Sequence, residues 1–442
     1  MLYERIRELS APATVHIEFV SSCNEKCRHC YNFWREENAP ANLISRENVD
    51  KIIDAVQQAG VFHVILTGGE PLINYKQVLY AAQRLTDAGI SISLNSNLIL
   101  ATEDKMKALR DAGLTHVLTS IISHDPQTHD FIASSPGAWA KIIKGIEATL
   151  ASGISITNNM VISQRNKSHV YETGRLMKKL GVGGLCGTRV SPPAYADIHM
   201  RRELQVSIED AYSVLDQLLQ VKSDFGLGVS ALIPFPLCFL KDFEKYQDFA
   251  GRKCAAGTYT LSLNSNGDVH ACQKEGFVAG NIFSDGLSKV WENVRPWRTE
   301  EQLPSECKEC SALAECGGGC RVVGYGYTQQ LSGKDNLALD PIRDEDVTVT
   351  PAMWNHVDHD FFEVAPTLRF RPESGFTLLN IRAAKNMMIS DEAAQILRRK
   401  LKDQETFNLE GFGAQHRRTL AHLLKKGAVF VSSKVPEPVT KD

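Results

Sequence analysis

The regular alternation of strand-like and helix-like segments between residues 14 and 190 most constrains the fold. Each strand-like segment is short and apolar, and an amphipathic stretch separates it from the next. A strand–helix unit that recurs at intervals of about thirty residues requires parallel strands joined by right-handed crossovers. The predicted strands are Thr14–Val20, Val61–Leu66, Ile90–Asn95, Thr115–Ile121, Ile154–Ile162 and Leu185–Val190.

The intervening segments carry apolar residues at helical spacing. The clearest runs from Ser45, a plausible N-cap, to Gly60, which lies just beyond its end. Its predicted buried face consists of Val49, Ile52, Ile53 and Val56. Similar faces recur at Val78, Leu79, Ala82 and Leu85, and at Ile142, Ile143, Ile146 and Leu150, and a further helix is predicted over Ser207–Lys222.

These units predict an α/β fold, a partial (β/α)6 barrel, with functional loops beyond the carboxyl ends of its strands. A doubly wound open sheet is the alternative that periodicity leaves open. From "ALIPFPLCF" to about Asp346 the chain is rich in Gly and Cys, which indicates a module organised by metal. From about Thr348 to the end, the chain is no longer enriched in Gly and Cys. We therefore expect three domains, over residues 1–235, 236–346 and 347–442.

Composition places the chain in a reducing compartment. It has 442 residues and a net charge of −3 from 49 basic and 52 acidic residues, a balance that disfavours nucleic acid as a partner. The N-terminal stretch has no apolar core typical of a signal peptide, and no membrane-spanning run occurs. We expect a cytoplasmic protein without membrane association. Its 11 cysteines then favour metal or redox chemistry over disulfides.

A first cysteine motif, "CNEKCRHCY", follows the first predicted strand directly and contains Cys23, Cys27 and Cys30. Three thiolates can bind three irons of a [4Fe–4S] cube and leave the fourth iron open. A zinc half-site is the alternative for the isolated motif. The sequence "TGGEP" follows the second strand, and its glycines suit a backbone that approaches a ligand closely.

Together these motifs resemble the radical S-adenosylmethionine (radical SAM) superfamily, and the resemblance extends over the first domain. It implies a partial barrel, a catalytic [4Fe–4S] cluster on the three cysteines, and SAM bound at the open iron. Cleavage of SAM then gives a 5′-deoxyadenosyl radical that abstracts substrate hydrogen. The residues that it implies for SAM binding are Gly68, Gly69, Glu70, His29, Ser96, Ser120 and Asn159. Each of Ser96, Ser120 and Asn159 could equally satisfy backbone groups at a strand end.

A second set of cysteines ends in "CKECSALAECGGGC". Alone, Cys307, Cys310, Cys316 and Cys320 could form one zinc ribbon. With Cys254, Gly267 and Cys272 upstream, however, the spacing resembles the SPASM domain, which carries auxiliary [4Fe–4S] clusters. The resemblance implies one or two such clusters. It assigns Cys254, Cys272 and Cys320 to the first, with Cys238 as its expected fourth ligand, and Cys307, Cys310 and Cys316 to the second.

No cysteine follows Cys320, where the family supplies one more ligand. We expect a carboxylate in its place, with Asp340 favoured over Asp344 and Asp335, or else an open or absent second cluster. The leftover Cys186 is interpreted as a small buried residue, although a role as hydrogen donor or substrate contact stays open. No catalytic acid or base is singled out.

The C-terminal segment predicts a small α+β, winged-helix-like domain. Strands are expected at "TLRFRP" and "FTLLNIR", and helices at "SDEAAQILRRKLK" and "AQHRRTLAHLLKKG". The order of its strands and helices resembles that of the PqqD-like RiPP recognition element, which implies binding of a leader peptide to a sheet edge. Its basic residues are attributed to solvated helix faces rather than to DNA binding, and are Arg398, Arg399, Lys400, Arg417, Arg418, Lys425 and Lys426.

The expected function is therefore that of a radical SAM/SPASM maturase that crosslinks a ribosomally made precursor peptide through a C–C or thioether bond. Expected partners are that peptide, with its leader, and an electron donor such as flavodoxin or ferredoxin. The alternatives are an anaerobic sulfatase-type protein maturase and an iron–sulfur redox-sensing winged-helix regulator.

Overall fold

The structure is a computed structural model that describes residues 8–32, 41–193, 198–250, 252–343, 362–383, 385–403, 423–424 and 428–431. The chain divides into two compact units, Met1–Thr348 (unit 1) and Val349–Asp442 (unit 2). Both cysteine-rich segments belong to unit 1.

Unit 1 is built on a ten-stranded sheet with the order β10-β9-β8-β1-β2-β3-β4-β5-β6-β7. The neighbours from β8 to β7 are parallel, whereas β9 and β10 are antiparallel. The strands are β1 (Thr14–Glu18), β2 (His63–Thr67), β3 (Ser91–Asn95), β4 (His116–Thr119), β5 (Ser155–Ile162), β6 (Gly184–Arg189), β7 (Gly228–Ser230), β8 (Thr260–Leu263), β9 (Asp268–His270) and β10 (Gly280–Asn281).

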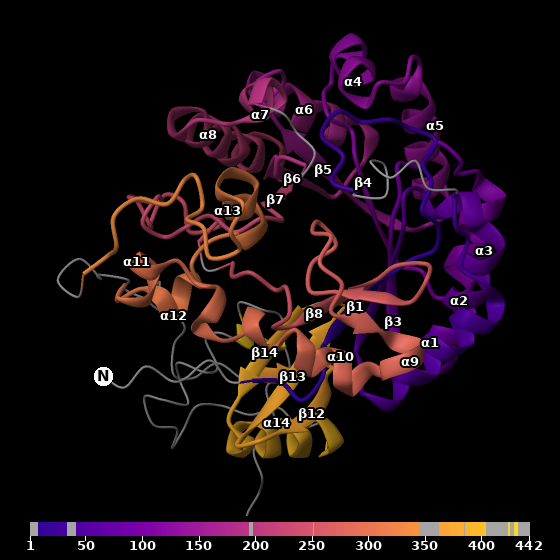
Figure 1. Ribbon diagram of the computed structural model, residues 1–442. Coiled ribbons are helices and arrows are strands. Elements are labelled where there is room, and N and C mark those ends of the chain that lie inside the picture. The colour runs from indigo at the N-terminus through magenta and orange to yellow at the C-terminus, as the bar shows by residue number, and fades with distance from the viewer. Residues whose placement is uncertain are drawn as a thin grey trace, which may run out of the picture. The chain divides into compact units, whose positions relative to one another are not determined.

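Most helices between β1 and β7 lie along the outer side of this curved sheet, whereas the helices nearest the last cysteines lie apart from that row (Figure 1). The helix bounds are α1 (Arg46–Gln58), α2 (Tyr75–Asp87), α3 (Glu103–Asp111), α4 (Pro126–Ala133), α5 (Ala138–Ala151), α6 (Val170–Leu180), α7 (Ile198–Leu204), α8 (Ile208–Phe225), α9 (Ile282–Asp285), α10 (Leu287–Asn293), α11 (Ser305–Lys308), α12 (Leu313–Cys316) and α13 (Arg321–Thr328).

The six predicted strands are confirmed as β1 to β6. The prediction for α1 is also confirmed: Ser45 caps it by accepting a hydrogen bond from the Asn48 N–H, and Val49, Ile52, Ile53 and Val56 are its buried residues. Each such side chain contributes about 1.5–3 kcal/mol when it is fully removed from water. The helices therefore stay on the sheet mainly through these apolar faces.

The inner face of the sheet, which is the face away from the helices, can hold a site, as the strand register shows. His16 lies opposite Ile65, and Ile65 lies opposite Ser93, so the three share one face. Asn159, Cys186 and Ser230 are aligned on the same face farther along the sheet. The alternate positions, such as Val15 and Leu66, are buried and apolar. Polar side chains on the inner face include Glu18, Thr67, Asn95 and Ser262.

Strand β8 comes from the cysteine-rich segment but pairs with β1 of the barrel. Val15 lies opposite Leu261, and Ile17 lies opposite Leu263. All four side chains are buried. The segment therefore continues the barrel sheet instead of forming a separate body, which the sequence did not indicate.

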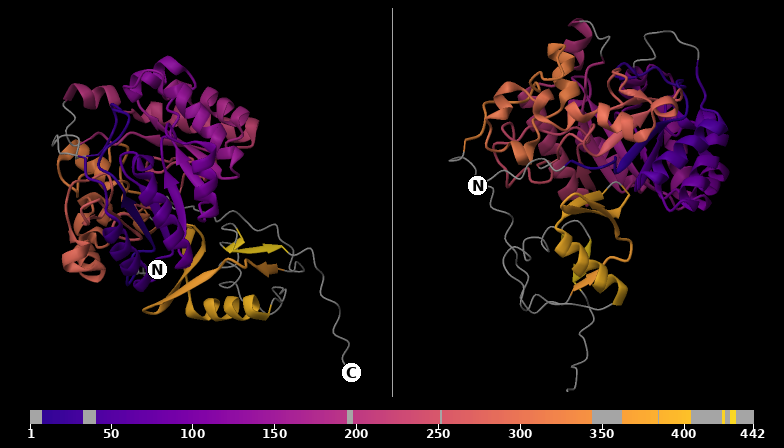
Figure 2. Two further views of the ribbon diagram at one scale, coloured as in Figure 1. Left: turned by 90° about the vertical axis from the view of Figure 1, so that its right-hand side faces the viewer. Right: turned by 60° about the horizontal axis from the view of Figure 1, so that its bottom comes forward.

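Unit 2 contains a three-stranded antiparallel sheet of β12 (Arg369–Glu373), β13 (Phe376–Arg382) and β14 (Lys385–Ile389), followed by α14 (Asp391–Asp403) (Figure 2). A second sheet pairs β11 (Phe362–Val364) with β15 (Val429–Val431). Leu379, Leu397 and Val429 belong to its own hydrophobic core. The predicted strands and the first helix are confirmed. The second predicted helix lies largely outside the described residues, as do the predicted basic residues Arg417, Arg418, Lys425 and Lys426.

Candidate functional site

The loop with Cys23, Cys27 and Cys30 leaves the carboxyl end of β1, and all three thiols are partly buried. Backbone bonds shape the loop: the Cys30 N–H donates to the Cys27 carbonyl at 3.1 Å, and the Glu25 N–H donates to Cys23 Sγ at 3.5 Å. Among the described residues, no three His, Cys, Asp or Glu side chains are placed to hold a single metal ion. The soft thiol donors suit a multi-iron cluster, which spaces its ligands more widely than one zinc ion does.

Two glycines after β2 let a second loop lie directly on the cysteine loop. The Gly69 N–H donates to the Val20 carbonyl at 2.8 Å, and the Glu70 N–H donates to the Ser22 carbonyl at 2.9 Å. A Cβ on Gly69 would lie 2.0 Å from the Ser22 carbonyl oxygen, far inside contact distance. The structure thus gives Gly69 a definite task, which is to permit backbone pairing with the cysteine loop.

The Glu70 carboxylate is buried at the centre of a hydrogen-bond network. It accepts from the Leu72 N–H at 2.9 Å, from the Ser96 hydroxyl at 2.8 Å and from the Asn97 N–H at 2.8 Å. Burial raises the pKa of Glu70 to about 7, although these donors oppose the shift. Ser96 therefore supports Glu70 in this structure. Its expected contact with SAM stays a prediction.

Asn97 joins the loop after β3 to the cysteine loop. Its side-chain amide donates to Asn24 Oδ1 at 2.7 Å and to Glu25 Oε2 at 2.9 Å. Asn24 and Glu25 lie inside the first cysteine motif, and Glu25 is buried. Neither residue was predicted from the sequence to have a role. The one sequence feature that could have indicated a role for Asn24 and Glu25 is their position between Cys23 and Cys27.

The remaining expected SAM contacts lie around the same end of the barrel. Ser120 follows β4, and His29 lies in the turn before Cys30. Asn159 is on the inner face of β5, and its buried side-chain oxygen has no hydrogen-bond partner in the part of the chain that the structure describes. Such an orphaned acceptor fits a ligand that carries hydrogen-bond donors.

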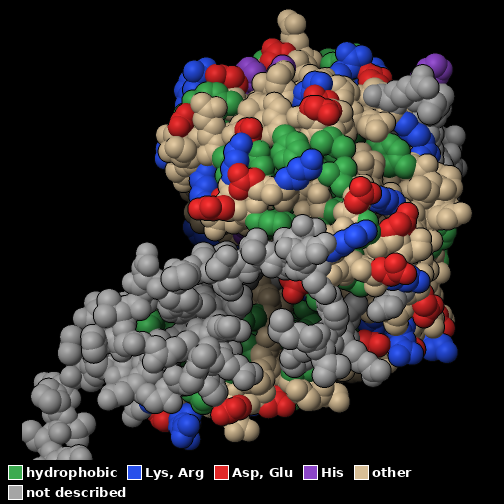
Figure 3. Space-filling view, turned by 90° about the vertical axis from the view of Figure 1, so that its left-hand side faces the viewer, with side chains coloured by type: hydrophobic (Ala, Val, Ile, Leu, Met, Phe, Trp, Pro, Cys, Tyr) green, Lys and Arg blue, Asp and Glu red, His purple; other side chains and the backbone are tan. Residues whose placement is uncertain are grey.

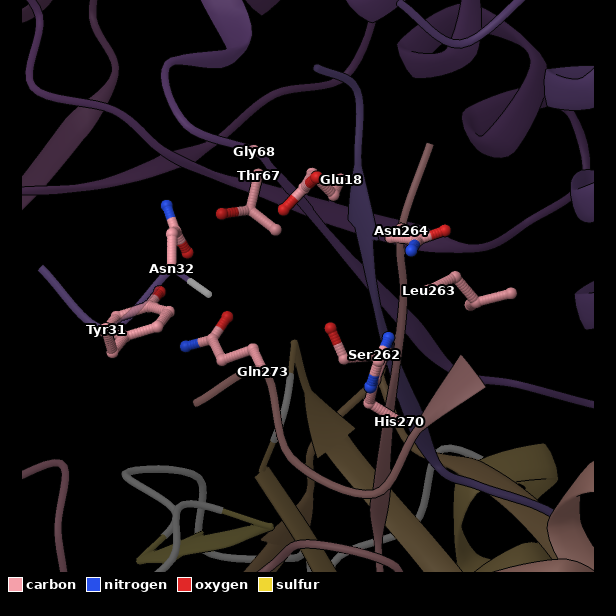
Figure 4. A pocket seen from close by; sticks show the side chains of 10 residues that line it. All are labelled: Glu18, Tyr31, Asn32, Thr67, Gly68, Ser262, Leu263, Asn264, His270 and Gln273. Carbon is pink, nitrogen blue, oxygen red and sulfur yellow. The ribbon is translucent and has the colours of Figure 1, made fainter. Parts of the chain in front are cut away.

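A hollow of about 330 Å³ adjoins the cysteine loop and the glycine motif (Figure 4). Glu18, Thr67 and Gly68 come from the barrel, whereas Ser262, His270 and Gln273 come from the cysteine-rich segment. The Glu18 and Thr67 side chains point toward one another, and the Leu263 side chain points away from them. Among the described residues of the lining, Glu18 is the one carboxylate, and none is a Lys or an Arg. The hollow therefore favours a neutral or cationic group over an anionic one.

Tyr31, another residue of this hollow, lies between two groups of cysteines. Burial raises its pKa, and nearby Cys30 and Cys272 raise it further. The Lys274 ammonium lies 5.6 Å from the centre of the Tyr31 ring. The first cysteine motif and the cysteine-rich segment thus approach each other across Tyr31.

Cys254, Cys272 and Cys320 form one group in the cysteine-rich segment. Burial is the main cause that raises the pKa of the Cys272 thiol, and its neighbours Cys254 and Cys320 add to it. The Cys320 N–H donates to Asp335 Oδ2 at 2.9 Å. This is the group of three that the resemblance assigned to the first auxiliary cluster.

Cys238 lies elsewhere, in contrast to its expected place with those three residues. It lines a hollow of about 410 Å³ with Cys307, Cys310 and Cys316. Burial raises the pKa of Cys307 to about 12, and Cys316, Cys238 and Cys310 reinforce the shift. Much of the remaining lining is apolar, including Leu237, Leu313 and Ile342. Figure 3 looks onto the side of unit 1 that carries α11 and α12, where hydrophobic atoms lie among charged side chains.

The structure places none of the described candidate carboxylates in this hollow. Asp340 is exposed and outside the lining, although Leu339 and Pro341 belong to it. Asp335 is buried and paired with Arg189. Asp344 lies outside the described residues.

Cys186 is buried on the inner face of β6, 3.0 Å from the Ser230 hydroxyl. Burial raises the pKa of its thiol. This environment agrees with its interpretation as a small buried residue, and it lies apart from both groups of cysteines.

A parallel, partly closed barrel that gathers thiols and glycines at the carboxyl ends of its strands defines the class: an enzyme that binds a cluster and a cosubstrate at its mouth. Residues 17–177 match the radical SAM superfamily, and residues 254–311 match SPASM, an iron–sulfur cluster-binding domain. The chain is a radical SAM superfamily enzyme with a SPASM domain, and these domains imply [4Fe–4S] clusters.

Several relatives align over most of their own length. An AdoMet-dependent heme synthase from Methanosarcina barkeri is 27% identical over 334 residues, which cover 72% of this chain and 94% of that protein. The mycofactocin maturase MftC of Mycobacterium tuberculosis is 27% identical over 346 residues, which cover 74% of this chain and 83% of that protein. The PqqA peptide cyclase of Gluconobacter oxydans is 24% identical over 352 residues, which cover 76% of this chain and 93% of that protein.

Solved structures share the fold. Streptococcus suis SuiB bound to its precursor peptide SuiA has a TM-score of 0.58 at 16% identity, with 74% of this chain and 76% of that chain covered. The structure of anSMEcpe with bound AdoMet has a TM-score of 0.59 at 18% identity, with 74% and 94% covered. Within the described residues, no helix has the length and apolar character needed to cross a membrane.

Proposed function

We propose that this enzyme modifies a ribosomally synthesised precursor peptide and installs a C–C or thioether crosslink. The observation that carries the proposal is the hollow that Glu18 lines, because it is bounded jointly by the barrel mouth and by the SPASM segment. A substrate side chain held there would lie beside the glycine motif and the first cysteine loop. The relatives named as a maturase and a peptide cyclase support this substrate class.

In this proposal Cys23, Cys27 and Cys30 hold the catalytic cluster, while Gly68, Gly69, Glu70 and the residues at the other strand ends hold SAM. When bound and reduced by a donor such as flavodoxin or ferredoxin, this cluster cleaves SAM to methionine and a 5′-deoxyadenosyl radical that takes a substrate hydrogen. Tyr31, Thr67 and Gln273 would enclose the substrate group and limit its exposure to water. A crosslink removes two hydrogens from the peptide. The radical takes one as a hydrogen atom, and the other would leave as a proton and an electron, with an auxiliary cluster of the SPASM segment as the electron acceptor.

Unit 2 is proposed to hold the leader of the peptide. Its β12-β13-β14 sheet is antiparallel, and among the described strands β12 and β14 each pair on one side alone. An edge strand can accept an extended peptide as an additional strand. The relatives cover 72–76% of this chain, close to the 348 of 442 residues in unit 1, which agrees with unit 2 being an addition to the shared enzyme.

A second candidate is conversion of a heme precursor, which the 94% coverage of the heme synthase favours. The lining of the Glu18 hollow disfavours it. Heme precursors carry several carboxylates, whereas the described lining residues include one carboxylate and no Lys or Arg. Unit 2 has no evident use in that reaction.

Mass spectrometry of candidate peptides tests the proposal. Short peptides encoded beside the gene are coexpressed with the enzyme, and the expected product has lost a pair of hydrogen atoms. A mass unchanged for every such peptide, together with SAM cleavage that responds to a porphyrin precursor, would assign the enzyme to the second candidate.

A further inference from the structure

The two groups of SPASM cysteines differ in size because of where Cys238 lies. It belongs to the segment after β7, far upstream of the cysteine run, yet it lines the same hollow as Cys307, Cys310 and Cys316. All 11 cysteines of the chain are described. The Cys254, Cys272 and Cys320 group therefore has no fourth cysteine, since Cys186 is hydrogen-bonded to Ser230 on the barrel strands.

Backbone N–H groups donate to two of the four sulfurs in the larger group. The Leu339 N–H donates to Cys238 Sγ at 3.2 Å, and the Leu237 N–H donates to Cys316 Sγ at 3.4 Å. Cys238 is thus tied to the segment after Cys320, where the family ligand was expected, and its neighbour Leu237 is tied to the cysteine run. N–H bonds to ligand sulfurs are one of the ways in which proteins tune iron–sulfur clusters. This hollow has the donors and the apolar surroundings of a cluster site.

Three consecutive glycines separate Cys320 from that group. Gly317, Gly318 and Gly319 have φ values of +71°, +78° and +75°, a conformation that other residues adopt only with strain. A Cβ on Gly318 would lie 2.9 Å from a Leu303 methyl carbon, and one on Gly319 would lie 2.9 Å from Asp335 Oδ2. The chain therefore turns sharply after Cys316, and Cys320 joins Cys254 and Cys272 instead.

We propose that Cys238, together with Cys307, Cys310 and Cys316, gives the second auxiliary cluster four thiolate ligands, and that the first auxiliary cluster has three thiolates and one iron without a cysteine ligand. That iron takes an exchangeable ligand, such as a soft donor on the substrate or in solution. The inference rests on the SPASM assignment and is independent of the proposed peptide substrate, because cluster ligation is measured without any substrate.

Two background variants isolate the auxiliary sites. Replacing Cys23, Cys27, Cys254 and Cys272 by alanine leaves the second site, and replacing Cys23, Cys27, Cys307 and Cys310 leaves the first. Cys238→Ala is then added to each, and iron, sulfide and the electron paramagnetic resonance spectrum are measured after anaerobic reconstitution. We expect the variant to lose a quarter or more of the iron in the second-site background and none in the first-site background. The reverse pattern would overturn the proposal.

Matched controls separate ligation from folding. Cys186→Ala should change neither background, and Cys238→Ser, which keeps the side-chain volume, should still alter the spectrum of the second site alone. Iron loss in both backgrounds would show that Cys238 acts through the fold, and the proposal would fail. Added imidazole or cyanide should shift the spectrum of the first-site background and not that of the second. A first-site spectrum insensitive to both ligands would refute its open iron.

Discussion

Asp335 and Arg189 form an ion pair that is almost fully shielded from solvent, with side-chain exposures of 0% and 5%. Asp335 also accepts hydrogen bonds from the Cys320 and Leu337 N–H groups, and Arg189 also donates to Asn336 Oδ1. The pair links the end of β6 to the segment after the last cysteine. In a chain without a cysteine in that segment, an ion pair holds it against the barrel.

Replacing Asp335 by alanine should therefore destabilise unit 1. The Arg189 charge would stay buried without its partner, at a cost of about 3–5 kcal/mol in the free energy of unfolding. Anaerobic urea unfolding measures the change. Adding Arg189→Met should recover part of it, whereas Asp248→Ala, which breaks an exposed pair with Lys222, should cost no more than about 1 kcal/mol. A double variant as unstable as Asp335→Ala would contradict the explanation.

Gly69→Ala should disrupt the catalytic cluster selectively. The added Cβ would lie 2.0 Å from the Ser22 carbonyl oxygen and push the cysteine loop away. The isolated protein should then lose iron from the first motif and keep its auxiliary iron. Gly183→Ala is the matched control, because its Cβ would lie at an ordinary 3.6 Å from the Ile156 carbonyl. Equal iron loss in both variants would show that the Gly69 contact has no special role.

SAM affinity should rise with pH through neutrality. Because burial raises the pKa of Glu70 to about 7, its carboxylate is mostly protonated below that pH and ionised above it. The radical SAM resemblance implies that Glu70 holds the methionyl ammonium of SAM, and a cation binds the ionised carboxylate more strongly than the protonated form. Glu70→Gln should weaken SAM binding roughly tenfold or more and abolish the pH dependence. Anaerobic calorimetry from about pH 6 to 8 measures both. A wild-type affinity that is constant over this range would remove Glu70 from that role.

Glu18→Gln should separate substrate handling from SAM handling. The Glu18 carboxylate is the charged group among the lining residues that the structure describes, so its loss should weaken substrate binding and raise KM. SAM cleavage without substrate should stay unchanged. Glu18→Lys supplies the sharper comparison: it should impair a peptide substrate further and leave an anionic heme precursor unprocessed. Improved turnover of the precursor with Gln or Lys would favour the second candidate function.

A variant that ends at Thr348 should keep substrate-independent SAM cleavage and lose affinity for the leader peptide. Unit 2 is compact and has its own core, so its removal should leave the core of unit 1 intact. Fluorescence anisotropy of a labelled leader, with full-length protein as reference and a scrambled leader as control, measures the loss. Unchanged affinity would place leader binding in unit 1.

The sequence predicted what local pattern determines. The alternating runs predicted β1 to β6, and Ser45 with its apolar face predicted α1. It did not predict contacts that depend on distant pairing. Nothing in the spacing of Cys238 shows that Leu339 lies beside it, and the family pattern assigned Cys238 to the other group. The sequence shows the three glycines between Cys316 and Cys320. Their positive φ values, which direct the Cys316 and Cys320 thiols to different groups, come from the structure alone.

The pairing of β8 with β1 also bears on how such enzymes can be recombined. The joint between barrel and SPASM segment is a row of matched side chains, Val15 against Leu261 and Ile17 against Leu263, inside a continuous sheet. A chimera that exchanged SPASM segments at a point in the linear sequence would join strands selected for different neighbours. A stable chimera should therefore take β1 and β8 from the same parent enzyme, so that the two paired strands keep their matched side chains.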